Sequence, residues 1–513
     1  MQTVGEYIEH YSCSQGNKAW LFSPESATRF TYTELKQRID QIGGELDSLG
    51  LGKGAKIAYL SHNGSWATLL HVGVMANGRV TVPLNATAGA VQLEYILNHS
   101  DAEAIFVSPA YEEKLAPLLG RVSRSIEVIA LDEEHGPTWP RDIPGNATRD
   151  TSNVPRPKAA DPAMLVYTSG STGLPKGALL SHRAIVRGGL NVVGGHELTP
   201  GDRALCVLPI YHINGAMVTV VAPLVSGGSV VMPRRFSTSS FWSLVAEYQC
   251  TWSSIVPTII KYLLDRADQE PIDFGADDRL AAFRFARSAS APLPVTVLQQ
   301  WENIFGIPMI ETLGLTETAG TVATNPMPPL QSKPGSVGRA FGNEIKVIDK
   351  GGADCLPGTA GEIVIRGKNL LDHYYKNPEA TDAAFAGGWF RTGDLGLLDE
   401  EGYLYLTGRL KELIIRGGEN IAPREIDDVL YQHDAVLEAA AVGVNDAAYG
   451  QEVVACVVRR EGFRCSEREL KDLCESAVGK YKSPKRIYFM DDLPKGPSGK
   501  ILRLKLPALI ASM

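Results

Sequence analysis

Short apolar runs alternate with segments of helical spacing through the first two-thirds of the chain. Runs of strand length occur at Lys56–Leu60, Ala104–Val107, Ile126–Leu131 and Met164–Tyr167. Strands that alternate with helices are typical of an α/β fold whose sheets are largely parallel. We expect two such α/β units, joined by the stretch 136–162, whose six prolines predict a loop.

A long helix is predicted near the start of the chain, because apolar residues recur at helical spacing between Leu35 and Leu46. Thr31 and Glu34 have the spacing of a capping box, in which each side chain accepts a hydrogen bond from the other residue's backbone N–H. The helix should therefore begin just after Thr31.

The stretch Ala204–Pro233 contains no Asp, Glu, Lys or Arg and has the length of a membrane span. Prolines and glycines interrupt it, however, so no continuous run of about 20 apolar residues remains. We therefore expect a buried strand–helix–strand passage here and no membrane span.

The pattern of apolar and turn-forming residues changes near Gly335. Short apolar runs at Glu344–Ile348 and Gly361–Ile365 are separated by Gly/Pro turns, which indicates a small β subdomain. Beyond Gly408 the pattern predicts a compact α+β domain, with a helix at 424–433 and strands at 439–444 and 452–458. We accordingly divide the chain into an N-terminal domain of residues 1–408 and a C-terminal domain of residues 409–513.

Composition narrows the class of protein. The 513 residues are 44% hydrophobic and 21% charged, with a net charge of −8, which fits a globular protein of several units and argues against a basic nucleic-acid binder. The seven cysteines include no C-x-x-C pair, which favours reduced thiols over a disulfide framework or a zinc site. The first residues lack a basic head followed by an apolar stretch, so we expect a cytoplasmic protein.

The segment Thr168–Gly177 carries the strongest chemical signal. It combines three glycines, four hydroxyl side chains and Lys176 directly after a predicted strand. Glycines let backbone N–H groups converge on an anion, hydroxyls add donors and lysine adds a charge, so this segment suits a polyphosphate. It is not the common P-loop, because Lys176 lies between Pro175 and Gly177. A flexible turn is the alternative for this segment alone.

Two acidic residues follow in glycine-containing segments. Glu317, in the segment Thr312–Thr318, is a candidate Mg²⁺ ligand on a predicted glycine turn. Mg²⁺ usually binds only one or two carboxylates, and phosphate oxygens and water complete its coordination. Asp394 ends the segment Trp389–Asp394 at a predicted turn, where a carboxylate can accept hydrogen bonds from ribose hydroxyls. Taken singly, each has an ordinary alternative as a solvated loop or capping residue.

Two basic segments complete the series. Gly408–Ile421 joins a basic pair to a strand and then to a Gly-Gly turn, and Leu493–Ile501 places Lys500 on a Pro/Gly loop near the C-terminus. Taken alone, Lys500 has the alternative of a solvent-exposed lysine.

The five motifs, in this order, closely resemble those of the superfamily of AMP-forming adenylating enzymes, which includes acyl- and aryl-CoA synthetases, adenylation domains of non-ribosomal peptide synthetases and firefly luciferase. The resemblance extends from Phe30–Leu35 to Lys500. Its most specific parts are the phosphate loop, Thr316-Glu317, Thr392-Gly393-Asp394, Gly408-Arg409 and Gly499-Lys500.

The resemblance implies that ATP, Mg²⁺ and coenzyme A take part. Such enzymes form an acyl adenylate from a carboxylic acid and ATP, release pyrophosphate, and mostly pass the acyl group to a thiol. Lys500 would bridge the attacking carboxylate and the α-phosphate, Thr316 would touch phosphate, and Glu317 would hold Mg²⁺. Further nucleotide contacts implied by the resemblance are Thr168, Ser169, Gly170, Ser171, Thr172, Gly173, Lys176, Ser290, Glu311, Thr312, Leu313, Asp394 and Arg409.

The resemblance also implies a second active-site arrangement for thiol transfer. The C-terminal domain would rotate about Lys411, withdrawing Lys500 and bringing in the turn at Gly417 and Gly418. Glycine suits that turn because a pantetheine arm must pass close to the backbone.

The acyl pocket implied by the resemblance comprises His212, Ile213, Asn214, Ala289 and Thr321. Amino-acid-activating relatives carry an aspartate near Ile213, and its absence argues against an α-amino acid substrate. Ala289 replaces a common glycine and narrows the site, and Leu313 replaces a tyrosine that usually lies against adenine. We expect a short or polar acid rather than a long fatty acid.

Arg287, immediately before the Ser-Ala-Ser-Ala-Pro-Leu segment, is a candidate anchor for a second carboxylate, with a surface arginine as the alternative. For the whole chain the favoured function is an acid–CoA ligase. The alternatives are an adenylating enzyme that loads a carrier protein or joins the acid to an amine, and a non-catalytic sensor.

Overall fold

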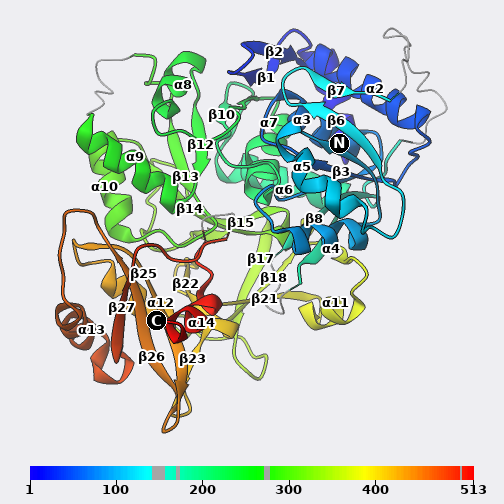
Figure 1. Cartoon of the computed structure of the whole chain (residues 1–513). Coiled ribbons are helices and arrows are strands. Elements are labelled where there is room, and N and C mark those ends of the chain that lie inside the picture. The colour runs from blue at the N-terminus through cyan, green and yellow to red at the C-terminus, as the bar shows by residue number, and fades with distance from the viewer. Residues whose placement is uncertain (141–155, 169–173, 271–277, 497–499) are drawn as a thin grey trace.

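The computed structural model describes residues 1–140, 156–168, 174–270, 278–496 and 500–513. It has the predicted α/β architecture with a large N-terminal and a smaller C-terminal domain (Figure 1). Two large sheets and three layers of helices make up most of the N-terminal domain.

The first large sheet has nine strands in the order β16-β15-β14-β13-β12-β10-β11-β1-β2. From β1 to β14 along the sheet the pairs are parallel, and β2, β15 and β16 are antiparallel additions at the two edges. The strands are β1 (Ala19–Ser23), β2 (Thr28–Thr31), β10 (Arg203–Leu205), β11 (Ser229–Val231), β12 (Trp252–Ile255), β13 (Phe285–Ser288), β14 (Met309–Leu315), β15 (Gly320–Thr324) and β16 (Arg339–Ala340).

The second large sheet has eight strands in the order β19-β9-β8-β4-β3-β5-β6-β7, and its central pairs are parallel as predicted. The strands are β3 (Lys56–Leu60), β4 (Val80–Pro83), β5 (Ala102–Val107), β6 (Glu127–Asp132), β7 (Gly136–Thr138), β8 (Pro162–Thr168), β9 (Lys176–Ser181) and β19 (His373–Tyr374). The stretch 136–162 was expected to be a loop throughout. It begins instead with β7, because the turn at 133–135 folds this segment back onto β6.

One layer of helices lies between the two sheets and shares a single apolar core with both. It consists of α1 (Val4–Ser14), α2 (Tyr32–Ser48), α3 (Ser65–Ala76), α6 (His182–Gly195), the π-helix η2 (Asn214–Val221) and α7 (Ala222–Ser226). The predicted capping box of α2 is present, with Thr31 and Glu34 bonded reciprocally. The stretch from β10 through η2 and α7 to β11 is the predicted buried strand–helix–strand passage. No helix in the described residues is long and apolar enough to cross a membrane.

Two further layers cover the outer faces of the sheets. Helices α4 (Ala90–Ser100) and α5 (Pro109–Leu119) pack against the eight-stranded sheet, and α8 (Phe241–Tyr248), α9 (Pro257–Gln269) and α10 (Val295–Phe305) pack against the nine-stranded sheet. Each outer layer has its own apolar cluster.

The predicted β subdomain is a five-stranded antiparallel sheet. Its strands are β17 (Asn343–Ile348), β18 (Gly361–Gly367), β20 (Phe385–Ala386), β21 (Trp389–Leu398) and β22 (Leu404–Arg409), and α11 (Pro378–Ala384) precedes β20.

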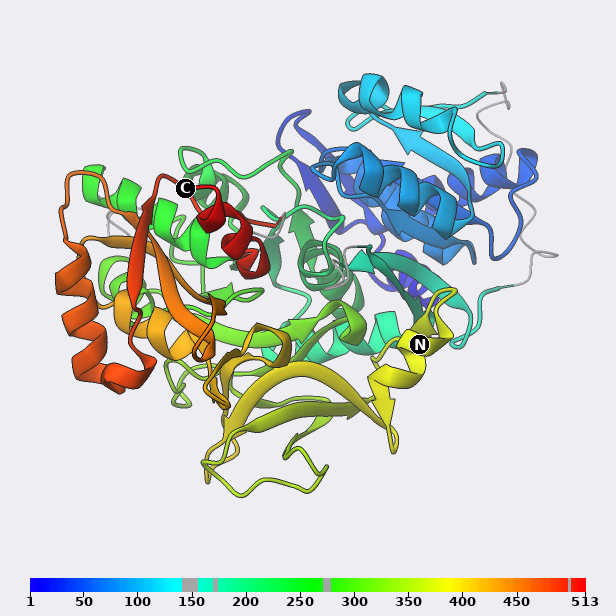
Figure 2. The same ribbon diagram turned by 60° about the horizontal axis from the view of Figure 1, so that its bottom comes forward.

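The last hundred residues form the predicted α+β unit, drawn orange to red in Figures 1 and 2. Its elements are η4 (Leu410–Glu412), β23 (Ile414–Arg416), β24 (Glu419–Ile421), α12 (Pro423–Leu430), β25 (Val436–Asp446), β26 (Gly450–Arg459), α13 (Glu467–Lys482), β27 (Arg486–Met490), η5 (Arg503–Lys505) and α14 (Leu506–Ala511). The helix predicted to reach His433 ends at Leu430. The backbone N–H of Ala435 donates to the ring of His433, which closes a turn there instead.

Candidate active site

A cavity of about 920 Å³ lies between the N-terminal strands and the C-terminal unit. The parallel strands β12, β13 and β14 end at its wall, in agreement with the general rule that α/β sheets bind ligands at the carboxyl ends of their strands. Predicted site residues that line it are Thr168, His212, Ile213, Asn214, Ser290, Glu311, Thr312, Leu313, Thr316, Glu317, Asp394, Arg409 and Lys500.

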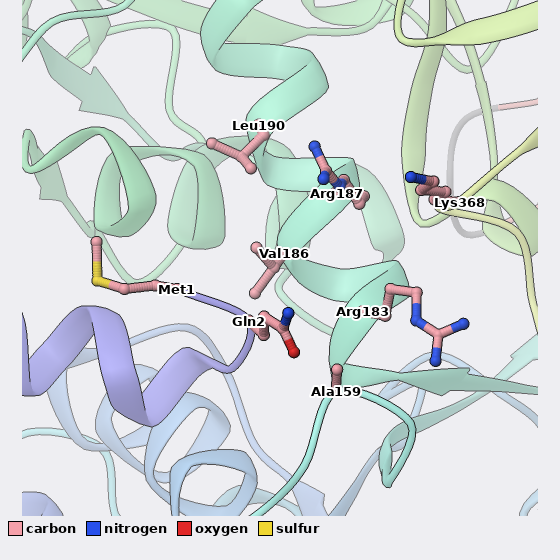
Figure 3. Close-up of a pocket in the computed structure, with 8 residues that line it drawn as sticks. All are labelled: Met1, Gln2, Ala159, Arg183, Val186, Arg187, Leu190 and Lys368. Atoms are coloured by element: carbon pink, nitrogen blue, oxygen red, sulfur yellow. The ribbon is translucent and has the colours of Figure 1, made fainter.

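A second cavity, of about 430 Å³, lies beside α6. Its lining includes the basic residues Arg183, Arg187 and Lys368 on one side and the apolar side chains of Val186 and Leu190 on the other (Figure 3). It contains no predicted site residue, so the larger cavity is the candidate active site.

Asp394, Arg409 and Lys500 converge on one side of the large cavity. Asp394 and Arg409 are register partners on β21 and β22, and their side chains form an ion pair of 2.6 Å between Oδ1 and Nε. Burial raises the pKa of the Asp394 carboxyl, against the opposing charges of Arg409 and Lys500. Burial, and then the charge of Arg409, lowers the pKa of the Lys500 amine. The predicted position of Asp394 at a turn is wrong, because β21 continues through it with Gly393 at φ +69°.

Glu317, Tyr374 and Lys176 form a second cluster. Glu317 lies in the 3₁₀ turn η3 (Thr316–Thr318), directly after β14, and its Oε1 accepts a 2.9 Å hydrogen bond from the Tyr374 hydroxyl. The Lys176 Nζ lies 5.0 Å from the centre of the Tyr374 ring. Burial raises the pKa of the Glu317 carboxyl. Tyr374 belongs to none of the five motifs, and its part in this cluster comes from β19, which pairs with β9.

The rest of the predicted phosphate loop lies mostly outside the described residues. Thr168 ends β8 and Lys176 begins β9, and the two are partners in an antiparallel hairpin. Its connecting residues Ser169, Gly170, Ser171, Thr172 and Gly173 are outside the described part of the chain. Thr168 lines the cavity, and Lys176 contacts Tyr374, which also lines it.

The strand β14 carries Glu311, Thr312 and Leu313 along the cavity wall. The glycine turn expected before Glu317 is wrong: Gly314 continues the strand, with a register shift against β15 at this point. Glu311 Oε2 accepts a 2.8 Å hydrogen bond from the backbone N–H of Gly335, and burial raises the pKa of its carboxyl to about 7. Leu313 packs into the apolar cluster of the small sheet.

His212, Ile213 and Asn214 line the cavity where the chain enters the π-helix η2. Asn214 Nδ2 donates a 3.3 Å hydrogen bond to the Ser290 hydroxyl. Ser290 has φ +74°, a conformation that L-residues with a side chain seldom adopt and that clusters at functional sites. Ala289 and Thr321 are buried behind this wall rather than exposed in it, among the residues described.

Arg287 is not a surface residue, so the alternative considered for it is wrong. Only 1% of the residue is exposed. Its guanidinium donates 2.9 Å hydrogen bonds to Asn214 Oδ1, Ser254 Oγ and Thr321 Oγ1. Burial lowers the pKa of the guanidinium to about 9. Arg287 therefore lies directly behind the part of the cavity wall that Asn214 forms.

The residues predicted for the second half-reaction are Lys411, Gly417 and Gly418. Lys411 is in η4, between the small sheet and the C-terminal unit. Gly417 and Gly418 form the turn between β23 and β24, with φ +55° and +88°. None of the three lines the cavity among the described residues.

Comparisons with known proteins agree over nearly the whole chain. The family model described as AMP-binding enzyme matches residues 9–375, and that described as AMP-binding enzyme C-terminal domain matches residues 425–500. The sulfoacetate–CoA ligase of Cupriavidus necator is 46% identical over 509 residues, with 98% of this chain and 97% of the relative covered. The oxalate–CoA ligase of Arabidopsis thaliana is 34% identical over 482 residues, with 92% of each covered.

Solved structures give the same result at the level of the fold. The ATP-bound crystal structure of MatB from Rhodopseudomonas palustris superimposes with a TM-score of 0.89 at 28% identity, covering 99% of each chain.

Proposed function

The chain belongs to the AMP-binding enzyme family and is an acid–CoA ligase, and we propose that its large cavity forms an acyl adenylate before the acyl group passes to coenzyme A. The acid is short and polar, in keeping with the sulfoacetate– and oxalate–CoA ligases among its relatives. The observation that carries the proposal is the meeting of Lys500, Asp394 and Arg409 at one wall of the cavity.

The first step needs positioning and charge neutralisation more than a covalent catalyst. Asp394 would accept from the ribose hydroxyls while Arg409 holds its carboxylate in place. Lys500, whose neighbours include a second cation, would stabilise the negative charge that develops as the substrate carboxylate attacks the α-phosphorus. Lys176 and Thr168 would hold the pyrophosphate that leaves.

Glu317 fits a magnesium site. Its carboxylate is half-buried at the cavity, and one oxygen is fixed by Tyr374, which orients the side chain. Mg²⁺ commonly binds through one or two carboxylates plus substrate phosphates, so a single glutamate beside a phosphate loop suffices. Bound there, Mg²⁺ would neutralise phosphate charge.

The second step would require a movement of the C-terminal domain, residues 409–513, relative to the N-terminal domain. We propose that the C-terminal domain rotates about Lys411 and brings Gly417 and Gly418 toward the acyl end. Both are glycines with positive φ, so they form a turn that carries no side chain, along which a pantetheine arm can pass. Hinge motions of this kind are common in enzymes with two successive active-site arrangements.

A two-stage assay tests the function. Purified enzyme with Mg·ATP and a panel of acids should release pyrophosphate with short polar acids and not with long-chain fatty acids. Added coenzyme A should then give the acyl thioester, detected by its mass. Pyrophosphate release without a thioester would favour a carrier protein or an amine as acceptor, and a lack of ATP–pyrophosphate exchange with every acid would favour a sensor.

A further inference from the structure

Arg287 is a buried cation whose recorded partners are all neutral. Three oxygens accept from it, those of Asn214, Ser254 and Thr321, and no ion pair joins it to a carboxylate in the described part of the chain. Its Nε also has no hydrogen-bond partner among these residues. Burying a charge without a counter-charge is costly, so such a residue is seldom retained for stability alone.

Arg79 provides an internal comparison. It is equally buried, with 1% of the residue exposed, but it forms an ion pair with Asp47 and also donates to the backbone carbonyl of Leu51. Arg79 lies just before β4 of the other large sheet and does not line the large cavity. Arg79, which serves the fold, therefore has a carboxylate partner. Arg287, behind the acyl end of the cavity, has none in the described part of the chain.

Asn214 links Arg287 to the cavity in a fixed orientation. A guanidinium can only donate, so the amide atom of Asn214 that faces it must be the oxygen, and the Ser254 hydroxyl donates to the same oxygen at 2.8 Å. The amide N–H₂ is thereby turned the other way, toward Ser290 and the cavity. A ligand at this end meets N–H and O–H donors with a positive charge directly behind them.

We propose that this end of the cavity is an anion subsite, in which Asn214 and Ser290 bind, and the buried charge of Arg287 attracts, the second acidic group of a short dianionic acid. The proposal rests on the adenylating function, because the first carboxylate must point toward Lys500. The shared chemistry is a second carboxylate or a sulfonate, attached to the reacting carboxyl group either directly or through one CH₂ group. Two relatives, named for sulfoacetate and oxalate, act on acids of this class.

Matched substrates test the subsite. Pyrophosphate release is measured with sulfoacetate, oxalate and malonate, and with the monomethyl esters of oxalate and malonate, which keep the carbon backbone, add one methyl group and lose the second charge. The better of oxalate and malonate should have a kcat/KM at least about 30-fold above that of its own monomethyl ester, as expected for hydrogen bonds to a charged group in a buried site. Equal use of diacid and ester would overturn the proposal.

Asn214→Asp is the sharpest variant. It keeps the volume and both accepting contacts, but it supplies a carboxylate to Arg287 and removes the N–H₂ donor. We expect it to lose the preference for the dianion, through KM rather than kcat, while use of the monoester persists. Arg287→Met should lose the same preference and Arg287→Lys should recover part of it.

Arg79→Met is the matched control, because it also removes a buried arginine, here from the segment just before a parallel strand. It should lower the thermal stability of the protein. The ratio of kcat/KM for the diacid to kcat/KM for its ester, both measured on the same preparation, should not change. An unchanged ratio in Asn214→Asp and Arg287→Met would contradict the subsite alone. Absence of pyrophosphate release from wild-type enzyme with every acid would instead contradict the adenylating function.

Discussion

Glu311 links burial to pH at the level of a single residue. Its pKa of about 7 lies above the ordinary 4.5 because burial disfavours the charged carboxylate. The folded state therefore binds a proton more tightly than the unfolded state. The stabilisation is fully present below pH 4.5 and is lost as the pH rises through about 7.

Glu311→Gln removes this titration and keeps an acceptor for the Gly335 N–H. We expect the free energy of unfolding of the wild type, relative to the variant, to fall by up to about 3 kcal/mol between pH 4.5 and pH 8. Urea denaturation of both proteins across this range measures the difference. A constant difference across the range would show that folding does not shift the pKa of Glu311.

Single residues also show where sequence reasoning succeeds and where it stops. The capping box of Thr31 and Glu34 was predictable because both partners lie within one turn of helix. The bond from Tyr374 to Glu317 joins residues 57 positions apart, and neither sequence neighbourhood indicates the other. The burial of Arg287 was missed for a different reason: charged side chains are rarely fully buried, so exposure is the ordinary expectation.

At the scale of elements, the packing of α6 against η3 positions Glu317. A Cβ atom at Gly188 of α6 would stand 2.1 Å from the carbonyl oxygen of Ala319, just after η3. The backbone carrying Glu317 therefore depends on the absence of a side chain at Gly188.

Gly188→Ala should push η3 away from α6. We expect the free energy of unfolding to fall by about 1–3 kcal/mol, as for other overpacked cores. Because Glu317 would be displaced, pyrophosphate release should also need a higher Mg²⁺ concentration for half-maximal rate. Gly44→Ala in α2 is the control, because nothing lies within 4 Å of its added Cβ and alanine favours a helix. If thermal melts and Mg²⁺ titrations of Gly188→Ala match the wild type, this packing argument is wrong.

The wrong turn predictions have one cause at the scale of elements. Glycine ordinarily indicates a turn, so Gly314 and Gly393 suggested that Glu317 and Asp394 follow or end at turns. Both glycines lie instead in antiparallel strands, each at or near a register shift. Glycine in a strand often marks such an irregularity, and only the partner strand reveals which case applies.

For the whole molecule, periodicity predicted the two α/β units, the small β sheet and the α+β unit, because each depends on local pattern. The placement of Lys500 against Asp394 and Arg409 depends on contact between units, which only the resemblance to a known family implied. Lys500 lines the cavity and Gly417 does not, and we propose that this arrangement serves the first half-reaction.

Lys500→Ala separates the two half-reactions. Without its charge, adenylate formation should slow by at least about 100-fold, comparable to losing an oxyanion donor. Transfer from supplied acyl-AMP to coenzyme A should persist, because Lys500 would be withdrawn in that step. Lys505→Ala, an exposed lysine nearby in the chain, should leave both rates unchanged. Equal loss of both steps in Lys500→Ala would contradict this division.

Lys411→Pro should give the opposite result, because the chain at η4 must change its backbone angles for the C-terminal domain to rotate. Proline fixes φ near −65°, a value compatible with the 3₁₀ turn seen here, so the adenylating arrangement is kept while rotation is hindered. ATP–pyrophosphate exchange should remain near the wild-type rate, and thioester formation from supplied acyl-AMP should fall steeply.

Lys411→Ala removes the charge but leaves φ free, so its thioester step should stay close to wild type. If both variants lose thioester formation equally, the lysine side chain matters rather than the hinge, and the rotation axis must lie elsewhere in the chain.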